Sequence, residues 1–154
     1  MENPPARSAE ERKRHTLRRL EEDVDLWVAS AEAGTGAPYL VPLSFAWDGT
    51  SLLFATTATS ITGRNLLASG QARIGLGPTR DVVMVDGPVQ AHTAEELSEE
   101  THAWFAESSG WDPRRQSNAE AYRWFRLTPR RIQAWREANE IQGRDLMRDG
   151  KWLV

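Results

Sequence analysis

Cysteine is absent from the sequence, which excludes disulfides, thiolate metal ligands and a cysteine nucleophile. Histidine is scarce, and His15, His92 and His102 share no spacing typical of metal ligands, so we expect no metal site. No apolar run approaches the roughly 18 residues of a membrane span. Residues 1–15 also lack the apolar region of a secretory signal. We therefore expect a soluble, cytoplasmic protein with no membrane partner.

An excess of positive charge is missing as well, because 19 lysines and arginines stand against 22 aspartates and glutamates. This balance argues against a nucleic-acid partner. The sequence contains neither a Gly-x-Gly-x-x-Gly segment nor a phosphate-loop lysine motif, and it lacks a Gly-x-Ser-x-Gly nucleophile elbow. It therefore carries no standard signature of a dinucleotide-binding enzyme, a nucleoside triphosphatase or a serine hydrolase.

The length of 154 residues suits one domain with a core of its own. Residues 8–11, Ser-Ala-Glu-Glu, fit a capping box and predict a helix that runs to about Glu22. Most of that helix is charged, so we expect it to lie on the surface. Residues 1–23 are accordingly predicted to form an N-terminal arm and surface helix, and residues 24–154 a single domain.

Short runs of β-branched, aromatic and leucine side chains follow, separated by turn residues. The Asp48-Gly49 pair predicts a tight hairpin turn, because both residues tolerate the positive φ that such a turn needs. Strands are expected at Leu26–Ala31, Tyr39–Trp47, Ser51–Phe54, Ala72–Leu76, Val82–His92 and Phe125–Trp135, the last interrupted at Pro129. Helices are expected at Arg64–Ser69, from Thr93 to Gly110, and at Ser117–Trp124.

Hairpins, rather than a regular alternation of strand and helix, connect most of these strands. The pattern predicts a mainly β protein of the α+β class, built as a closed or partly closed antiparallel barrel with peripheral helices. A parallel doubly wound sheet is disfavoured for the same reason.

The segment from Thr56 to Asn65 is rich in hydroxyl side chains and precedes a helix and an arginine. Hydroxyls beside free backbone N–H groups at a helix start can bind a phosphate through several hydrogen bonds at once. Turns favour the same residues for purely structural reasons, and a capping turn is the alternative interpretation.

In the order of its elements, the chain resembles the FMN-binding split-barrel superfamily, which includes pyridoxamine 5'-phosphate oxidase-like proteins and deazaflavin-dependent reductases. The segments that carry this resemblance are Pro38–Phe45, Leu53–Thr56, Ser60–Leu66 and Phe125–Trp135. The resemblance implies an antiparallel split β-barrel that binds FMN. It also implies a homodimer with the cofactor sites at the interface.

The same resemblance assigns expected roles to individual residues. Backbone groups of Pro42, Leu43 and Ser44 would contact the flavin ring, and Thr56 and Thr57 would flank it. Ser60, Thr62 and Arg64 would approach the phosphate, with Asn65 supporting the turn and Arg80 as a second source of positive charge. Trp135 and Arg144 would meet the cofactor from the other subunit.

Two departures from the family pattern limit the function that it implies. Ile61 and Thr62 stand where members that hold FMN tightly have a basic pair, which leaves Arg64 as the only cation of the turn. Glu140–Gly143 occupies the region where true pyridoxamine phosphate oxidases carry an Arg-x-His element, so we do not expect that activity.

The leading hypothesis is an oxidoreductase that uses FMN for hydride transfer to an unknown small-molecule substrate. A reductase that uses the deazaflavin coenzyme F-420 is one alternative, because the turn lacks the basic pair. A non-catalytic dimeric protein that holds a flavin or a haem-related ligand is the other. No residue is singled out as a catalytic acid or base.

Overall fold

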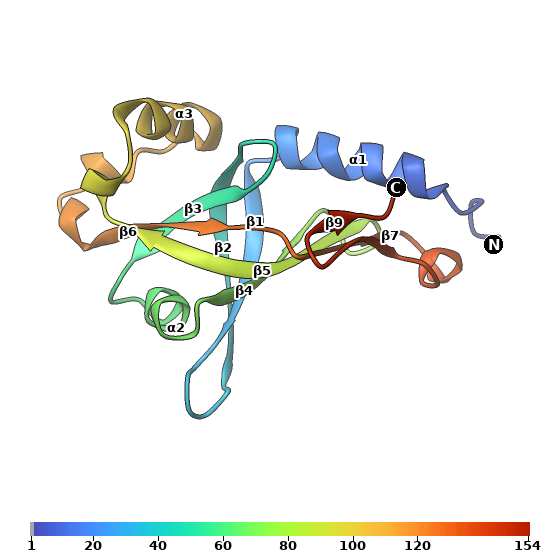
Figure 1. Ribbon diagram of the computed structural model, residues 1–154, viewed down its shortest axis with the longest axis horizontal. Coiled ribbons are helices and arrows are strands. Elements are labelled where there is room, and N and C mark those ends of the chain that lie inside the picture. Colours follow the sequence, from blue (N-terminus) through green and yellow to red (C-terminus); the bar gives the residue numbers. More distant parts are fainter. Residues whose placement is uncertain (1) are drawn as a thin grey trace.

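The structure is a computed structural model that describes residues 2–154, and its centre is an antiparallel β-barrel (Figure 1). Its strands are β1 (Asp25–Ala31), β2 (Pro38–Trp47), β3 (Leu52–Thr57), β4 (Gln71–Leu76), β5 (Val82–His92), β6 (Tyr122–Leu127), β7 (Arg131–Trp135), β8 (Asp145–Arg148) and β9 (Lys151–Trp152). Its α-helices are α1 (Ala9–Glu22), α2 (Ile61–Ser69) and α3 (Glu99–Ser109). The predicted α+β architecture, an antiparallel split barrel with peripheral helices, is confirmed.

The barrel closes because β5 pairs along its length with several neighbours. Strands β4, β1, β2, β3, β6 and β5 follow one another, and pairing between β4 and β5 completes the ring. The first part of β5 also pairs with β7, from which β8 and β9 continue as an extension of the sheet. Gly87 lies where β5 turns from one set of partners to the other, and a Cβ there would collide with the carbonyl oxygen of Thr128.

Alternating side chains along the strands fill the barrel. In β1, for example, Leu26 and Val28 are buried whereas Trp27 between them is exposed, as expected for a strand with one face on the core. Phe45, Phe54 and Phe125 meet in the main core. A second apolar cluster, which includes Leu53, Phe105 and Trp124, lies under α3 on the outside of β3 and β6.

The N-terminal helix is confirmed with its capping box, in which Ser8 and Glu11 bond each other's backbone amides. It packs against β2, β7 and β8. The boundary predicted between residues 23 and 24 as a division of the chain stays a prediction. Among the described residues, no helix is long and apolar enough to cross a membrane.

Two local predictions differ from the structure, and one pair of strands was missed. The capping box at Thr93 closes only a single 3-10 turn, and α3 begins later, with Ser98 as its cap. The helix predicted at Ser117–Trp124 is wrong: a 3-10 turn spans Ala119–Ala121, and the next residue begins β6, because pairing with β3 extends the backbone there. Strands β8 and β9 were not predicted from the sequence.

Candidate functional site

The hydroxyl-rich turn joins the end of β3 to the start of α2 and is held together by its own side chains. The Ser60 hydroxyl caps α2 by accepting a hydrogen bond from the Gly63 amide at 2.9 Å, and it donates to the Thr57 carbonyl oxygen at 2.9 Å. It also lies 3.2 Å from the Thr56 hydroxyl. The capping role considered from the sequence is thus confirmed for Ser60, and the turn is a compact unit rather than an open loop.

Thr62 differs from the other hydroxyl residues of this turn because its side-chain oxygen has no hydrogen-bond partner among the described residues. The residue is only 2% exposed. It occupies the first turn of α2, where the leading N–H groups find no partner within the helix and where the helix dipole favours an anion. A buried polar atom without a partner is costly, and this hydroxyl is an unused donor in the first turn of α2.

Gly63 allows α2 to begin this close to β3. A Cβ at this position would collide with the Thr57 carbonyl oxygen, so only glycine permits the approach. Sequence reasoning did not single out Gly63. Its position three residues after a serine cap was the available signal, but only the fold shows that a backbone carbonyl occupies the space of a side chain.

Arg64 and Asn65 have different surroundings. The Arg64 guanidinium is exposed and donates to the Thr59 carbonyl oxygen at 3.1 Å, which leaves its other N–H groups available. The Asn65 side chain is buried and donates to the Ser30 hydroxyl at 3.1 Å, so it ties α2 to β1. Asn65 therefore anchors α2 to the barrel, and Arg64 is the only cation of the turn; their predicted roles toward a cofactor stay predictions.

The predicted ring contacts lie on β2, the strand beside β3. Phe45 pairs with Phe54, which places Leu43 and Thr56 two residues beyond that pair on adjacent strands. Pro42 is exposed opposite Trp27, and the Ser44 hydroxyl donates to Asp25 at 2.8 Å. The β2 residues and the turn therefore belong to one neighbourhood, which we call the turn cluster (residues 42–44 and 56–65).

The other predicted residues form a second group beyond β7. The Arg144 guanidinium stacks over the Trp135 ring at 5.1 Å from its centroid. Arg80 is nearby in the fold, but its guanidinium fork binds the Glu137 carboxylate at 3.0 and 2.9 Å. We call residues 135–144 the C-terminal loop, with Trp135 and Arg144 at its two ends.

The structure does not bring these two groups together within one chain. Around the sheet, β2 and β7 are separated by β1, β4 and β5. The barrel is closed, so β2 lies across it from β5, the strand with which β7 pairs. A ligand on the outside of the barrel at the turn cluster would therefore be on the other side from Trp135 of the same chain.

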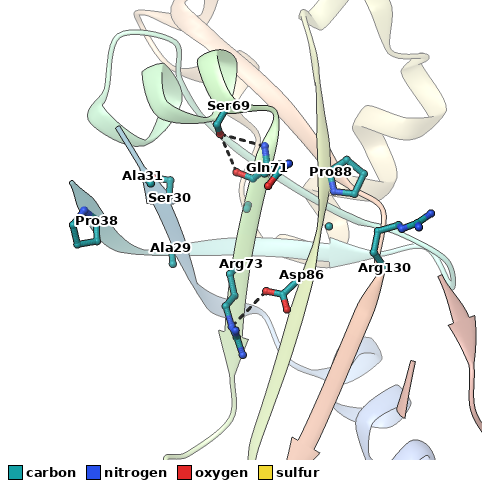
Figure 2. A pocket seen from close by; sticks show the side chains of 12 residues that line it. Ala29, Ser30, Ala31, Pro38, Ser69, Gln71, Arg73, Asp86, Pro88 and Arg130 are labelled. Carbon is teal, nitrogen blue, oxygen red and sulfur yellow. Dashed lines mark hydrogen bonds and ion pairs between the residues drawn. The ribbon is translucent and has the colours of Figure 1, made fainter. Parts of the chain in front are cut away.

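A cavity of about 860 Å³ opens elsewhere, on the outer side of β1, β4 and β5 near the last residue of α2 (Figure 2). The ion pair between Arg73 and Asp86, 3.4 Å apart, lies along it. None of the predicted cofactor residues lines this cavity; its link to them is Ser30, the partner of Asn65. Within the described residues, no group of three histidine, aspartate or glutamate side chains is arranged to hold a metal ion.

Comparison with known families decides the relationship. The family model described as pyridoxamine 5'-phosphate oxidase matches residues 13–136. The chain belongs to this family. The match includes the turn cluster and ends just after Trp135, so it covers both groups of predicted residues except Arg144. No curated protein matches the sequence significantly.

Several solved structures share the fold. The chain is similar to an F420 reductase, with a TM-score of 0.60 and 19% identity over 77% of this chain and 94% of the other. It is similar to a pyridoxamine 5'-phosphate oxidase-related, FMN-binding protein from Nostoc punctiforme, with a TM-score of 0.51 and 18% identity over 87% and 86%. It is also similar to a heme-binding protein from Mycobacterium smegmatis, with a TM-score of 0.67 and 17% identity over 94% and 58%.

Proposed function

We propose that this family member binds FMN and is an oxidoreductase that acts on a small molecule other than pyridoxamine phosphate. The observation that carries the proposal is the Thr62 hydroxyl, which is buried without a partner in the first turn of α2. The exposed Arg64 guanidinium, two residues later in the same turn, adds the positive charge that a phosphate at this helix start prefers. FMN, when bound, supplies the hydride chemistry.

Residues of the chain would position the cofactor rather than react with it. Ser60 and Gly63 fix the backbone of the turn, and the buried Asn65 prevents α2 from moving away from β1. Pro42 is exposed on the adjacent strand and has no backbone N–H group. A planar ring can therefore approach this part of β2 without covering an amide that needs a hydrogen-bond acceptor.

The separation of the turn cluster from Trp135 supports a homodimer. In the order β2, β1, β4, β5, β7, the middle strand is β4. Suppose that two copies pack through the outer face of β4, with the two-fold axis running along β4 between them. The strand order of the facing copy is then reversed, so that β7 of one copy faces β2 of the other. The exposed side chains of Trp27 (50%) and Leu40 (58%) on that face would be covered by the second copy.

One observation favours the deazaflavin coenzyme F-420 as a second candidate. Ile61, at the start of α2, is 43% exposed where a tight FMN site would carry a cation. A cofactor whose phosphate group needs less positive charge would tolerate this side chain better. A non-catalytic dimer that holds a flavin or a haem-related ligand is compatible with the same site.

Titration of the purified protein with FMN, coenzyme F-420 and haem tests these alternatives. We expect FMN to bind at micromolar concentration. Thr62→Val should weaken it about tenfold without lowering the stability of the free protein, since valine keeps the shape and removes only an unpartnered hydroxyl. Arg64→Ala should weaken it tenfold or more.

Arg14→Ala is the matched control, because Arg14 is an exposed arginine on α1 that belongs to neither group of predicted residues and should leave cofactor affinity unchanged. Binding of neither FMN nor F-420 at micromolar levels would overturn the enzyme proposal. Light scattering should report about twice the 17.3 kDa chain mass, and a monomer would contradict the interfacial site.

A further inference from the structure

The C-terminal loop is held at its two ends by one buried arginine from α1. Arg12 is 7% exposed, and its Nη1 atom lies 3.2 Å from the Ala134 carbonyl oxygen and 3.1 Å from that of Gly143. These carbonyls belong to the peptide groups that immediately precede Trp135 and Arg144. A single guanidinium therefore fixes the backbone on which each member of the Trp135–Arg144 stack is carried.

The middle of the loop is tied to the N-terminal arm in the same way. Glu140, 3% exposed, accepts hydrogen bonds from the Arg7 amide at 2.9 Å and from the Arg7 side chain at 3.0 and 2.8 Å. It also accepts from the Arg136 amide at 2.8 Å. The Asn139 side chain donates to the Pro4 carbonyl oxygen at 2.8 Å. Residues 4–12 thus contact the loop at its centre and at both ends.

Burying Arg12 in this way is unfavourable for stability alone. Among the described residues Arg12 forms no ion pair with a carboxylate, and its Nε atom has no hydrogen-bond partner there. A charge removed from water costs free energy that two carbonyl contacts offset only in part. An apolar side chain could not hold these two peptide groups at one point, because it has no N–H group to donate to their carbonyl oxygens.

We propose that Arg12 is a positioning residue, which sets Trp135 and Arg144 in the orientation that receives the cofactor of the partner subunit. This inference rests on the function proposed above, in which both residues contact the cofactor. On this view α1 controls cofactor affinity without touching the cofactor. The N-terminal segment is then part of the site, although its sequence indicates only a surface helix.

The test uses the full-length protein labelled with 5-fluorotryptophan, and the Trp135 fluorine resonance is assigned by its loss in Trp135→Phe. In Arg12→Leu without cofactor, we expect this resonance to shift or broaden while that of Trp124, buried under α3, stays in place. FMN affinity should fall about tenfold. Arg12→Lys, which keeps a charged donor, should restore part of both effects, and the exposed Arg14→Leu on the same helix should change neither.

An unmoved Trp135 resonance in folded Arg12→Leu would overturn the inference, and so would a displacement of every tryptophan resonance. If Arg12→Leu does not fold, Arg7→Gln loosens the centre of the same loop and is measured in the same way. Because the resonance is recorded without cofactor, it separates the two proposals. A wild-type protein that binds neither FMN nor F-420 refutes the function, whereas an unchanged Trp135 refutes the role of Arg12.

Discussion

The turn cluster and the C-terminal loop are both candidate parts of one site, but they are stabilised in opposite ways. The turn between β3 and α2 is closed by contacts among neighbours, such as the bond from the Gly63 amide to Ser60 three residues earlier. The loop is held from a distance, because Arg7 and Glu140 are 133 positions apart in the chain. The first is a local structure on the barrel, and the second depends on where α1 docks.

This difference has consequences for how the two parts respond to change. A turn closed by contacts among its own residues loses its structure when a substitution disturbs its own backbone. A loop held by buried arginines responds to conditions that alter those ion pairs and hydrogen bonds, including pH. The predictions below test this contrast, beginning with the largest effect.

Gly63→Ala should produce the largest loss of stability. Alanine would otherwise favour a helix, but here its Cβ would collide with the Thr57 carbonyl oxygen, which belongs to the backbone and cannot move aside alone. We expect the free energy of unfolding to fall by about 4 kcal/mol, near the upper end for single substitutions. Urea denaturation measures this loss.

Gly75→Ala is the matched control. Its new Cβ would meet only the Met84 side chain, at 3.1 Å, and a flexible thioether can adjust. We expect a loss of under about 1 kcal/mol there. Equal losses in the two variants would show that the close approach of α2 to β3 is not rigid.

The contrast also explains which features could be predicted from the sequence. The Asp48-Gly49 hairpin and the Ser60 turn were predicted because their signals lie within a few residues of the structures that they form. The capping box at Thr93 misled because a cap specifies a first turn and not the length of the helix, and the extended Leu97 then ends it.

The surroundings of the C-terminal loop could not be predicted in this way. An arginine on a charged helix looks alike in the sequence whether it is solvated like Arg14 or buried like Arg12. Only the docking of α1 on β7 and β8 distinguishes them. The same holds for β8, which pairs with β7 across the intervening residues 136–144.

The second prediction concerns the buried ion pair between Arg7 and Glu140, which holds the centre of that loop. Hydrogen bonds from Arg7 are the main cause that lowers the pKa of Glu140 from 4.5 to about 2. A carboxylate whose pKa is lower in the folded state stabilises the protein above its unfolded pKa, and this stabilisation is lost as the pH falls from about 4.5 to about 2. The full contribution is about 3 kcal/mol.

Arg7→Gln should therefore lose roughly 3 kcal/mol at pH 7, because the carboxylate stays buried without its cation. Its stability should also fall less steeply than that of the wild type between pH 4.5 and 2. Urea denaturation of both proteins across this range measures the difference. Other carboxylates with lowered pKa values, such as Asp112 and Asp145, contribute equally to both curves. Parallel curves would show that Arg7 does not control the ionisation of Glu140.

The smallest effect is expected for the exposed ion pair between Arg80 and Glu137 of the same loop. Arg80 binds Glu137 through both arms of its guanidinium, but its side chain is 77% exposed, so water and salt screen the pair. Arg80→Ala should change the free energy of unfolding by under about 0.5 kcal/mol and leave the Trp135 fluorine resonance in place. FMN affinity should change by less than about threefold, since Glu137 already neutralises this charge. A tenfold loss of affinity would instead assign Arg80 to the cofactor phosphate, and a displaced Trp135 resonance would show that exposed contacts position the loop as firmly as the buried ones.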